Sequence, residues 1–212
     1  MSFVDIPVPH GRLEALHWKV EGACAAAVVC HPHPLHGGTM DNHVTYRVAG
    51  AFREAGVSAL RFNFRGAGRS TGRFDNGRGE VHDARAALDF LQGDQPGVPL
   101  WVAGFSFGSR VALQLALEDP RVERVMAVGM ALRAFDFGLV RQIHKPKAFV
   151  QGDRDEFAPL EDVQRMVEEA PPPRKLFVVP DCDHLATGRL EAFSQVAAEA
   201  VAWLRDSVPA SG

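Results

Sequence analysis

The sequence predicts an α/β protein built as three layers, with a mostly parallel β-sheet between two layers of helices. Two observations support this prediction. Short runs of consecutive apolar residues recur along the chain, which is typical of strands covered on both faces, and stretches with helical periodicity separate them. Right-handed crossovers between parallel strands would place the loops that follow the strands along one edge of the sheet.

The positions of the strands and helices are predicted from the pattern of apolar residues and from the glycines that end helices. Residues 13–20 alternate loosely, which is typical of an antiparallel edge strand. Buried strands are expected at residues 25–30, 57–64 and 98–103, and further strands at 122–130, 147–151 and 175–179. Helices are expected at residues 41–54, 80–91, 111–117, 160–170 and 190–204. Gly56 and Gly93 are expected to end the first two helices, because a glycine just beyond a helix readily adopts the left-handed conformation.

A chain of 212 residues is long enough for one sizeable core, so we expect residues 1–212 to form a single domain. The last stretch, residues 207–212, is expected to be a frayed tail because it is short, polar and lacks an apolar pattern.

Composition narrows the classes of partner. The formal net charge is −3 and the basic residues are scattered, so nothing favours a nucleic acid or an anionic membrane as partner. The three cysteines are an odd number without C-x-x-C spacing, which favours free thiols in a reducing compartment. Residues 1–20 lack the apolar core of a signal peptide, and the apolar run at 23–30 is too short to cross a bilayer. We therefore expect a cytoplasmic protein with a small-molecule substrate; the sequence does not indicate its oligomeric state.

A G-x-S-x-G motif at residues 104–108 lies where a predicted strand must turn sharply into a helix. A serine in such a turn is held in a sparsely populated backbone conformation, at a cost of roughly 1–3 kcal/mol. Gly104 and Gly108 let the strand and the helix pass closely, and the turn places the Ser106 hydroxyl at the positive end of the helix. The motif is short enough to be an ordinary Gly-Ser turn, so its interpretation depends on partners elsewhere in the chain.

A serine hydroxyl becomes an effective nucleophile when a base removes its proton and an acid orients that base. Asp153 and Asp155 follow one later strand, and His184, the only histidine after residue 155, follows the next. Each alone could be an ordinary loop residue: Asp155 a solvated or helix-capping carboxylate, His184 a surface histidine. Together with the turn at Ser106, the order Ser, Asp, His predicts a catalytic triad of Ser106, one of these two aspartates and His184.

The motifs together resemble those of the α/β-hydrolase superfamily, over residues 13–204. Residues 104–108 match its nucleophile elbow, and residues 63–70 are similar to its D-x-R-G-x-G-x-S loop, with Asn63 in place of Asp. Residues 152–159 resemble its acid loop G-x-x-D-x-x-x-P, which selects Asp155 over Asp153. Residues 31–42 resemble those of small, lidless bacterial members akin to dienelactone hydrolases and prolyl-oligopeptidase-like serine hydrolases.

The resemblance implies an α/β-hydrolase fold with a minimal lid or none, and an oxyanion hole made of backbone N–H groups. The first donor is the backbone N–H of Phe107. By position, the second donor is the backbone N–H of His33, with the N–H of Leu35 as the alternative. This chain departs from most members in having His-Pro at residues 31–32, where they have His-Gly.

Two further groups of residues have alternative interpretations. The connection over residues 131–140 is short where many relatives insert a lid; its Phe135, Phe137 and Leu139 are either core residues or the roof of a small acyl pocket. The histidines of the early part of the chain could be zinc ligands, but no carboxylate or cysteine accompanies them at suitable spacing, so no metal is expected. These histidines are His31, His33, His36 and His43.

The sequence therefore predicts a serine hydrolase, carboxylesterase-like, that cleaves an ester, thioester or related small acyl substrate through an acyl-enzyme on Ser106 and needs no cofactor. A serine peptidase or aminopeptidase-like amidase would use the same triad, but no extra domain that would position a peptide is visible. A non-catalytic binding module on the same fold is the third alternative.

Overall fold

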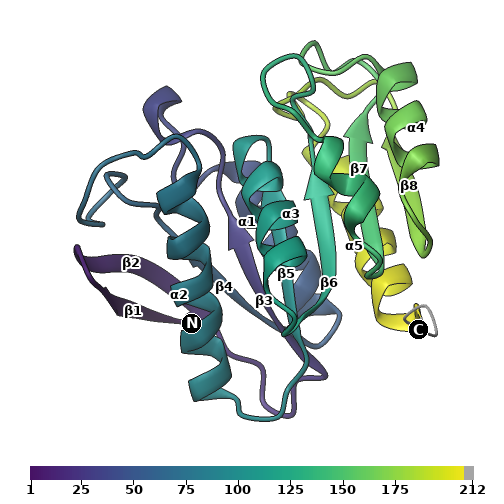
Figure 1. Ribbon diagram of the computed structural model, residues 1–212. Helices are drawn as coiled ribbons and strands as arrows, with labels where there is room; N and C mark the ends of the chain where they lie inside the picture. Colours follow the sequence, from purple (N-terminus) through teal and green to yellow (C-terminus); the bar gives the residue numbers. More distant parts are fainter. Residues whose placement is uncertain (208–212) are drawn as a thin grey trace.

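The structure, a computed structural model that describes residues 1–207, is built around one eight-stranded sheet. Its strands are β1 (Ser2–Val8), β2 (Gly11–Trp18), β3 (Ala25–Cys30), β4 (Val57–Phe62), β5 (Leu100–Phe105), β6 (Val122–Val128), β7 (Lys147–Gly152) and β8 (Arg174–Val179). They lie in the order β1-β2-β4-β3-β5-β6-β7-β8 (Figure 1). The pairs β1–β2 and β2–β4 are antiparallel, and all the other neighbouring pairs are parallel.

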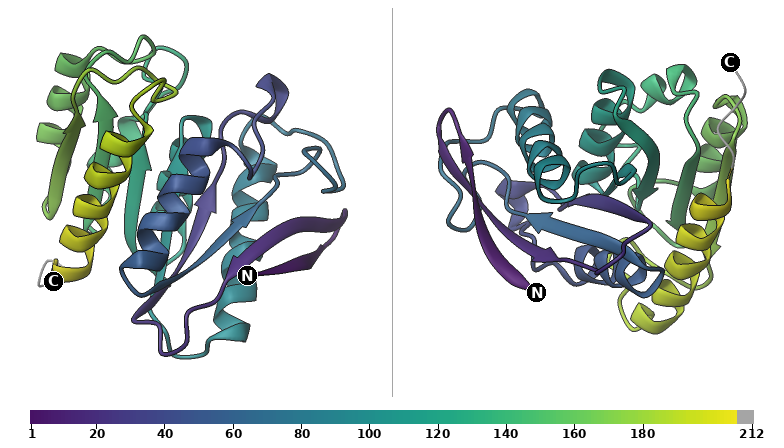
Figure 2. Two further views of the ribbon diagram at one scale, coloured as in Figure 1. Left: turned by 180° about the vertical axis from the view of Figure 1, so that it is seen from behind. Right: turned by 90° about the horizontal axis from the view of Figure 1, so that it is seen from below.

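Helices cover both faces of this sheet. They are α1 (His43–Glu54), α2 (Arg78–Asp94), α3 (Phe107–Glu118), α4 (Leu160–Glu169) and α5 (Leu190–Asp206), with short 3-10 turns η1 (Pro34–His36) and η2 (Gly138–Gln142). The apolar sides of α2, α3 and α4 pack in one core on one face, and those of α1 and α5 pack in a second core on the other (Figures 1 and 2). The predicted three-layer α/β class is thus confirmed.

The central strands have the burial that their sequence indicated. Every residue of β3, β4, β5 and β7 is buried, because helices cover both faces and a neighbouring strand lies on each side. The helix α1 also ends as expected, since Gly56 follows it with a φ of 78°.

The first strand of the sheet was missed. The predicted edge strand at 13–20 is β2, an inner strand, and the edge is β1, in which Ile6 is the only fully buried side chain. A strand that contacts the core at one position leaves little pattern in the sequence. The end of α2 was also predicted wrongly: the helix continues through Gly93, which lies where a side chain would meet open space, so nothing there requires the helix to stop.

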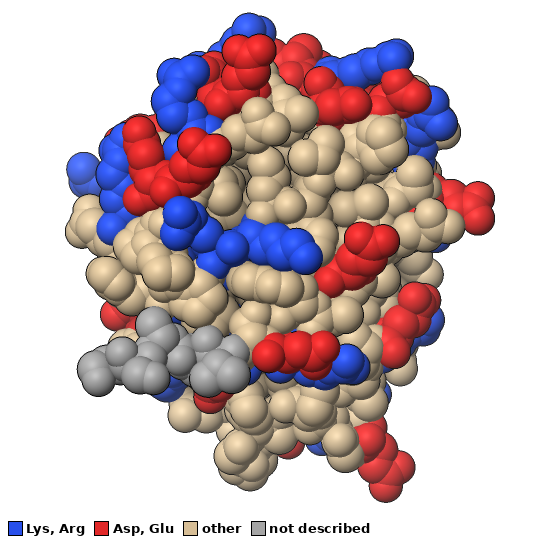
Figure 3. Space-filling model, turned by 90° about the vertical axis from the view of Figure 1, so that its right-hand side faces the viewer, with Lys and Arg blue, Asp and Glu red and all other residues tan. Residues whose placement is uncertain are grey.

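The end of the described chain is held to the sheet. The Arg124 guanidinium donates to the carbonyl oxygens of Leu204 (2.7 Å) and Ser207 (2.9 Å). Of the tail expected at 207–212, only Ser207 lies among the described residues. No helix within residues 1–207 has the length and apolar character needed to cross a membrane. On the face shown in Figure 3, acidic and basic side chains are interspersed.

A buried polar cluster fixes the loop after β4 at the edge where the parallel strands end. The Asn63 side-chain amide donates to Glu14 Oε2 (2.8 Å), and Asn63 Oδ1 accepts the Met40 N–H (2.8 Å). Arg69 donates to the same carboxylate from its backbone N–H and from Nε, both at 2.8 Å. Burial by itself would raise the pKa of Glu14, but these hydrogen bonds outweigh it and hold the pKa below its ordinary value.

This cluster explains why asparagine stands at position 63, where the resembling motif has aspartate. A carboxylate here would face that of Glu14 without a donor between them. We expect Asn63→Asp to lower the free energy of unfolding by about 1–3 kcal/mol, measured by urea denaturation at pH 7. In the double variant Asn63→Asp/Glu14→Gln the amide and the carboxylate exchange places, so most of the loss should be recovered. Equal stability of the single variant and the wild type would contradict this account.

Candidate active site

The turn between β5 and α3 holds Ser106 in a strained conformation. Its φ of 55° and ψ of −118° lie outside the regions that L-residues normally occupy. Two hydrogen bonds fix the turn: the Ser106 N–H donates to the Val128 carbonyl of the neighbouring strand (2.9 Å), and the Ser109 hydroxyl donates to the Ser106 carbonyl (2.6 Å). The Ser106 residue is 8% exposed, so protein atoms cover most of it.

Glycine is required on both sides of this serine because backbone segments approach very closely. A Cβ atom on Gly104 would lie 2.0 Å from the carbonyl oxygen of Gly108. A Cβ atom on Gly108 would lie 2.4 Å from the carbonyl oxygen of Cys30, at the end of β3. Rigid backbone occupies the space in both cases, so no side chain fits.

The structure brings the three predicted side chains together from three separate loops. His184 Nε2 lies 3.0 Å from Ser106 Oγ, and His184 Nδ1 lies 2.8 Å from Asp155 Oδ2. Asp153, the aspartate that was set aside, points elsewhere and accepts the N–H of Cys182 (3.2 Å). One imidazole therefore connects the hydroxyl to a buried carboxylate, whose side chain is 1% exposed.

The Asp155 carboxylate is oriented by two further donors. The Phe157 N–H donates to Oδ1 (2.8 Å), and the Gln151 amide donates to Oδ2 (2.7 Å), the oxygen that faces His184. Gln151 in turn accepts the Met130 N–H (2.9 Å), so its own orientation is fixed. The sequence analysis missed Gln151; the available signal was a polar amide at the end of the strand expected at 147–151.

Aromatic rings enclose the His184 imidazole. The ring centroids of Phe105 and Phe157 lie 5.0 Å and 4.6 Å from its centroid. From the other half of the chain, His43 at the start of α1 lies with Nε2 2.6 Å from the Leu185 carbonyl oxygen. This contact connects the loop that carries His184 to α1, a helix that is distant in the sequence. No local sequence pattern indicates this connection.

Comparison with known proteins places this arrangement in a family. A family model described as an alpha/beta hydrolase domain matches residues 25–197. The chain belongs to this family. An uncharacterized protein of Rickettsia prowazekii is 39% identical over 75% of this chain and 69% of its own length. One of Mycobacterium tuberculosis is 29% identical over 77% of this chain and 64% of its own length, so the chain spans only about two thirds of these relatives.

Solved structures of alpha/beta hydrolases are similar over nearly the whole chain. A structure described as an alpha-beta serine hydrolase homologue from Coxiella burnetii is 36% identical, with a TM-score of 0.87 over 93% of this chain and 96% of that one. A Xanthomonas campestris protein, described as a serine hydrolase without lid, is 30% identical, with a TM-score of 0.88 over 98% of this chain and 96% of that one. The resemblance to small, lidless members is confirmed, and the chain is a hydrolase with serine hydrolase homologues.

The first predicted oxyanion donor lies at the start of α3. Phe107 is the first residue of that helix, so its N–H has no partner four residues back in the helix. The Leu35 N–H, the alternative second donor, already donates to His33 Nδ1 (3.2 Å). The backbone hydrogen bonds within residues 1–207 include none donated by the His33 N–H. The geometry therefore favours His33 over Leu35.

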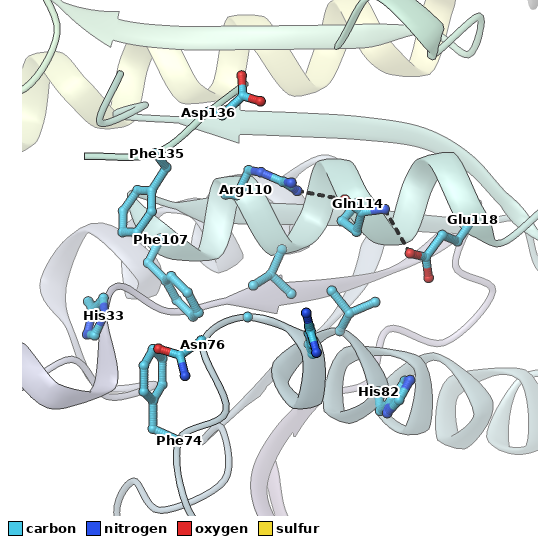
Figure 4. A pocket seen from close by; sticks show the side chains of 14 residues that line it. His33, Phe74, Asn76, His82, Phe107, Arg110, Gln114, Glu118, Phe135 and Asp136 are labelled. Carbon is cyan, nitrogen blue, oxygen red and sulfur yellow. Dashed lines mark hydrogen bonds between the residues drawn. The ribbon is translucent and has the colours of Figure 1, made fainter. Parts of the chain in front are cut away.

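A groove of about 610 Å³ lies between α2 and α3, beside the predicted oxyanion donors (Figure 4). Phe135, one of the three expected pocket residues, lies in its wall. The other two, Phe137 and Leu139, are not among the described residues that line the groove. They are buried in the core with α3 and α4, so for them the core interpretation replaces the pocket one.

The side chain of His31 makes its hydrogen bonds to backbone groups. His31 is fully buried: Nδ1 lies 2.6 Å from the Pro32 carbonyl oxygen, and Nε2 accepts the N–H of Phe64 (3.0 Å). Both ring nitrogens are thus used, which leaves none for a metal. Burial lowers the pKa of this imidazole to about 4.

The low pKa of His31 predicts how stability depends on pH. Between about pH 6.5, the ordinary pKa of histidine, and about pH 4, the unfolded chain takes up a proton that the folded chain does not. The free energy of unfolding should therefore decrease as the pH is lowered. Protonation of His31 in the unfolded chain should account for a loss of about 2 kcal/mol between pH 7 and pH 5. Urea denaturation at both pH values measures the change. His31→Gln lacks this titration, so its loss of stability over the same interval should be smaller; an equal loss would contradict the assignment.

Proposed function

We propose that this protein is a serine hydrolase of carboxylesterase type, which cleaves an ester, thioester or related small acyl substrate through an acyl-enzyme on Ser106. The observation that supports the proposal most directly is the pair of contacts at 3.0 Å and 2.8 Å that joins Ser106 Oγ to Asp155 Oδ2 through the His184 imidazole. This is the arrangement that serine nucleophiles require.

The first half of the reaction forms the acyl-enzyme. Ser106 Oγ attacks the carbonyl carbon while His184 Nε2 accepts the hydroxyl proton. Asp155, fixed by Gln151, accepts the Nδ1–H, holds the imidazole in the required tautomer and stabilises the imidazolium. The N–H groups of Phe107 and His33 donate to the oxyanion of the tetrahedral intermediate. When this intermediate collapses, His184 returns the proton to the departing alcohol or thiol, and the acyl group remains on Ser106.

The second half reverses these roles with water as the nucleophile. His184 removes a proton from a water molecule, which attacks the acyl carbonyl, and the same backbone donors stabilise the second oxyanion. The intermediate then releases the carboxylic acid and restores the Ser106 hydroxyl. Residues of this chain carry each step, and no step calls for a cofactor.

Removal of the nucleophile tests the proposal. With 4-nitrophenyl butyrate as substrate, we expect Ser106→Ala to lower kcat by about 10⁴-fold or more, because the residual rate depends on binding and the oxyanion donors alone. A matched control is Ser194→Ala on α5, outside the contacts described for the site, which should retain wild-type turnover. A fluorophosphonate should label the wild type and not Ser106→Ala. Unchanged turnover in Ser106→Ala would exclude Ser106 as the nucleophile.

A comparison of leaving groups separates the remaining alternatives. We expect the wild type to hydrolyse 4-nitrophenyl butyrate with a higher kcat/KM than aminoacyl 4-nitroanilides. The opposite order would favour the peptidase or amidase alternative. Failure to react with a fluorophosphonate and with both substrate classes would favour a binding module.

A further inference from the structure

The groove between α2 and α3 starts beside the nucleophile. Phe107, which directly follows Ser106, lies in its wall together with His33, so the predicted oxyanion donors and the groove share residues. At this end four rings gather, those of His33, Phe74, Phe107 and Phe135, with neighbouring centroids 4.7–6.2 Å apart (Figure 4). The part of a substrate nearest the scissile carbonyl would therefore contact an aromatic surface.

The groove becomes polar farther along α3. The residues that α3 contributes lie at positions 107, 110, 111, 114 and 118, a spacing that puts them on one face of the helix. Figure 4 shows Arg110, Gln114 and Glu118 following one another along this face, away from the rings. Arg110 donates to Gln114 Oε1 (2.8 Å), and Gln114 donates to Glu118 Oε1 (2.7 Å).

Arg110 is a half-buried cation that lacks a paired anion. Within residues 1–207 no carboxylate oxygen lies within 4.0 Å of its guanidinium, and its recorded side-chain partner is the neutral amide of Gln114. Burial lowers the pKa of this guanidinium from its ordinary value, although the nearby charges of Asp136 and Glu118 act in the opposite direction. An arginine remains charged under such conditions and gains from an anionic partner.

The arginine and acidic side chains that line the groove are Arg78, Arg110, Glu118 and Asp136. Glu118 is already paired with Arg85, which lies outside the groove (2.7 Å), and Asp136 accepts the Gly138 N–H (2.7 Å). Arg78, on the facing wall, is the first residue of α2, where the helix dipole disfavours a cation. Among the described residues Arg78 also has no ion-pair partner, so Arg110 and Arg78 are both cations of the groove lining without a salt bridge.

We propose that this groove selects substrates that carry a carboxylate or phosphate group, with Arg110 binding that anion beyond an apolar segment that lies on the aromatic rings. This inference rests on the proposed function for the position of the scissile bond. At 1.5 Å of rise per residue, the interval from Phe107 to the level of Arg110 and Gln114 is about 5–10 Å along α3. The anion is therefore separated from the reacting carbonyl by a short chain or one ring.

The test compares esters that differ in one charge. The 4-nitrophenyl monoester of adipic acid is compared with its neutral methyl ester, which puts the charge on the acyl side. The second pair, 4-carboxyphenyl butyrate and its methyl ester, puts the charge on the leaving group. For at least one pair, Arg110→Gln should lower kcat/KM for the anionic member by about tenfold or more, and for the neutral member by less than twofold. A phosphonate in place of the adipate carboxylate tells which anion is preferred.

Two control variants show whether the loss belongs to the groove. Arg110→Lys keeps the charge but loses the planar fork, so its loss for the anionic ester should be intermediate. Arg53→Gln removes one positive charge from α1, on the opposite face of the sheet, and should change neither kcat/KM value. If Arg110→Gln changes the anionic and neutral members of both pairs equally, or changes none of them, the proposal is overturned.

A binding measurement keeps this test independent of turnover. In Ser106→Ala, calorimetry with the intact adipate monoester should give a Kd about tenfold lower than in Ser106→Ala/Arg110→Gln, while the methyl ester should bind both variants alike. If this difference is found but the wild type hydrolyses no ester, the groove binds the anion and the proposed function is wrong. If esters are hydrolysed without such a difference, the proposed function stands and the anion site is wrong.

Discussion

The structure depends on one steric constraint, the close approach of three backbone segments where β3, β5 and α3 meet. Gly104 and Gly108 touch each other's backbone, and Gly108 also touches the end of β3. This contact leaves the chain no relaxed path through Ser106, so the serine adopts its unusual φ and ψ. The strain, of order 1–3 kcal/mol, is offset by the buried strands on both sides. The same corner places the first N–H of α3 in the residue next to Ser106, so the proposed nucleophile and the proposed oxyanion donor are positioned by one feature.

The proposed acid and base are positioned by a different means, the hydrogen bonds made by the later loops. Asp155 receives hydrogen bonds from Gln151 and Phe157, and the loop that carries His184 is tied to α1 through His43. These contacts join strands β7 and β8 to a helix from the first quarter of the chain. The site is therefore assembled from parts of the molecule that are far apart in sequence.

The parts of the fold and site that could be predicted from the sequence are those specified locally. The apolar run of β3 indicates a strand covered on both faces whatever its neighbours, and the glycines around Ser106 indicate close backbone contact within five positions.

Gln151 was missed because its role exists only once β7 lies beside β6 and the acid loop folds back. The groove was missed because it depends on how α2 packs against α3, and Phe137 and Leu139 turned inward because α3 and α4 cover them. β1 was missed because it contributes one fully buried side chain to the core.

The short connection between β6 and β7 affects how water is excluded from the reacting atoms in the proposed reaction. Between residues 129 and 146 the chain forms only the turn η2, and Phe157, which packs on the His184 imidazole, is itself 41% exposed. Because no long segment folds over this corner, the bound molecule has to supply the missing cover, and its hydrocarbon becomes part of the medium in which charge develops. In the proposed reaction, entry of the substrate and departure of the products therefore require no opening of a lid formed by this connection.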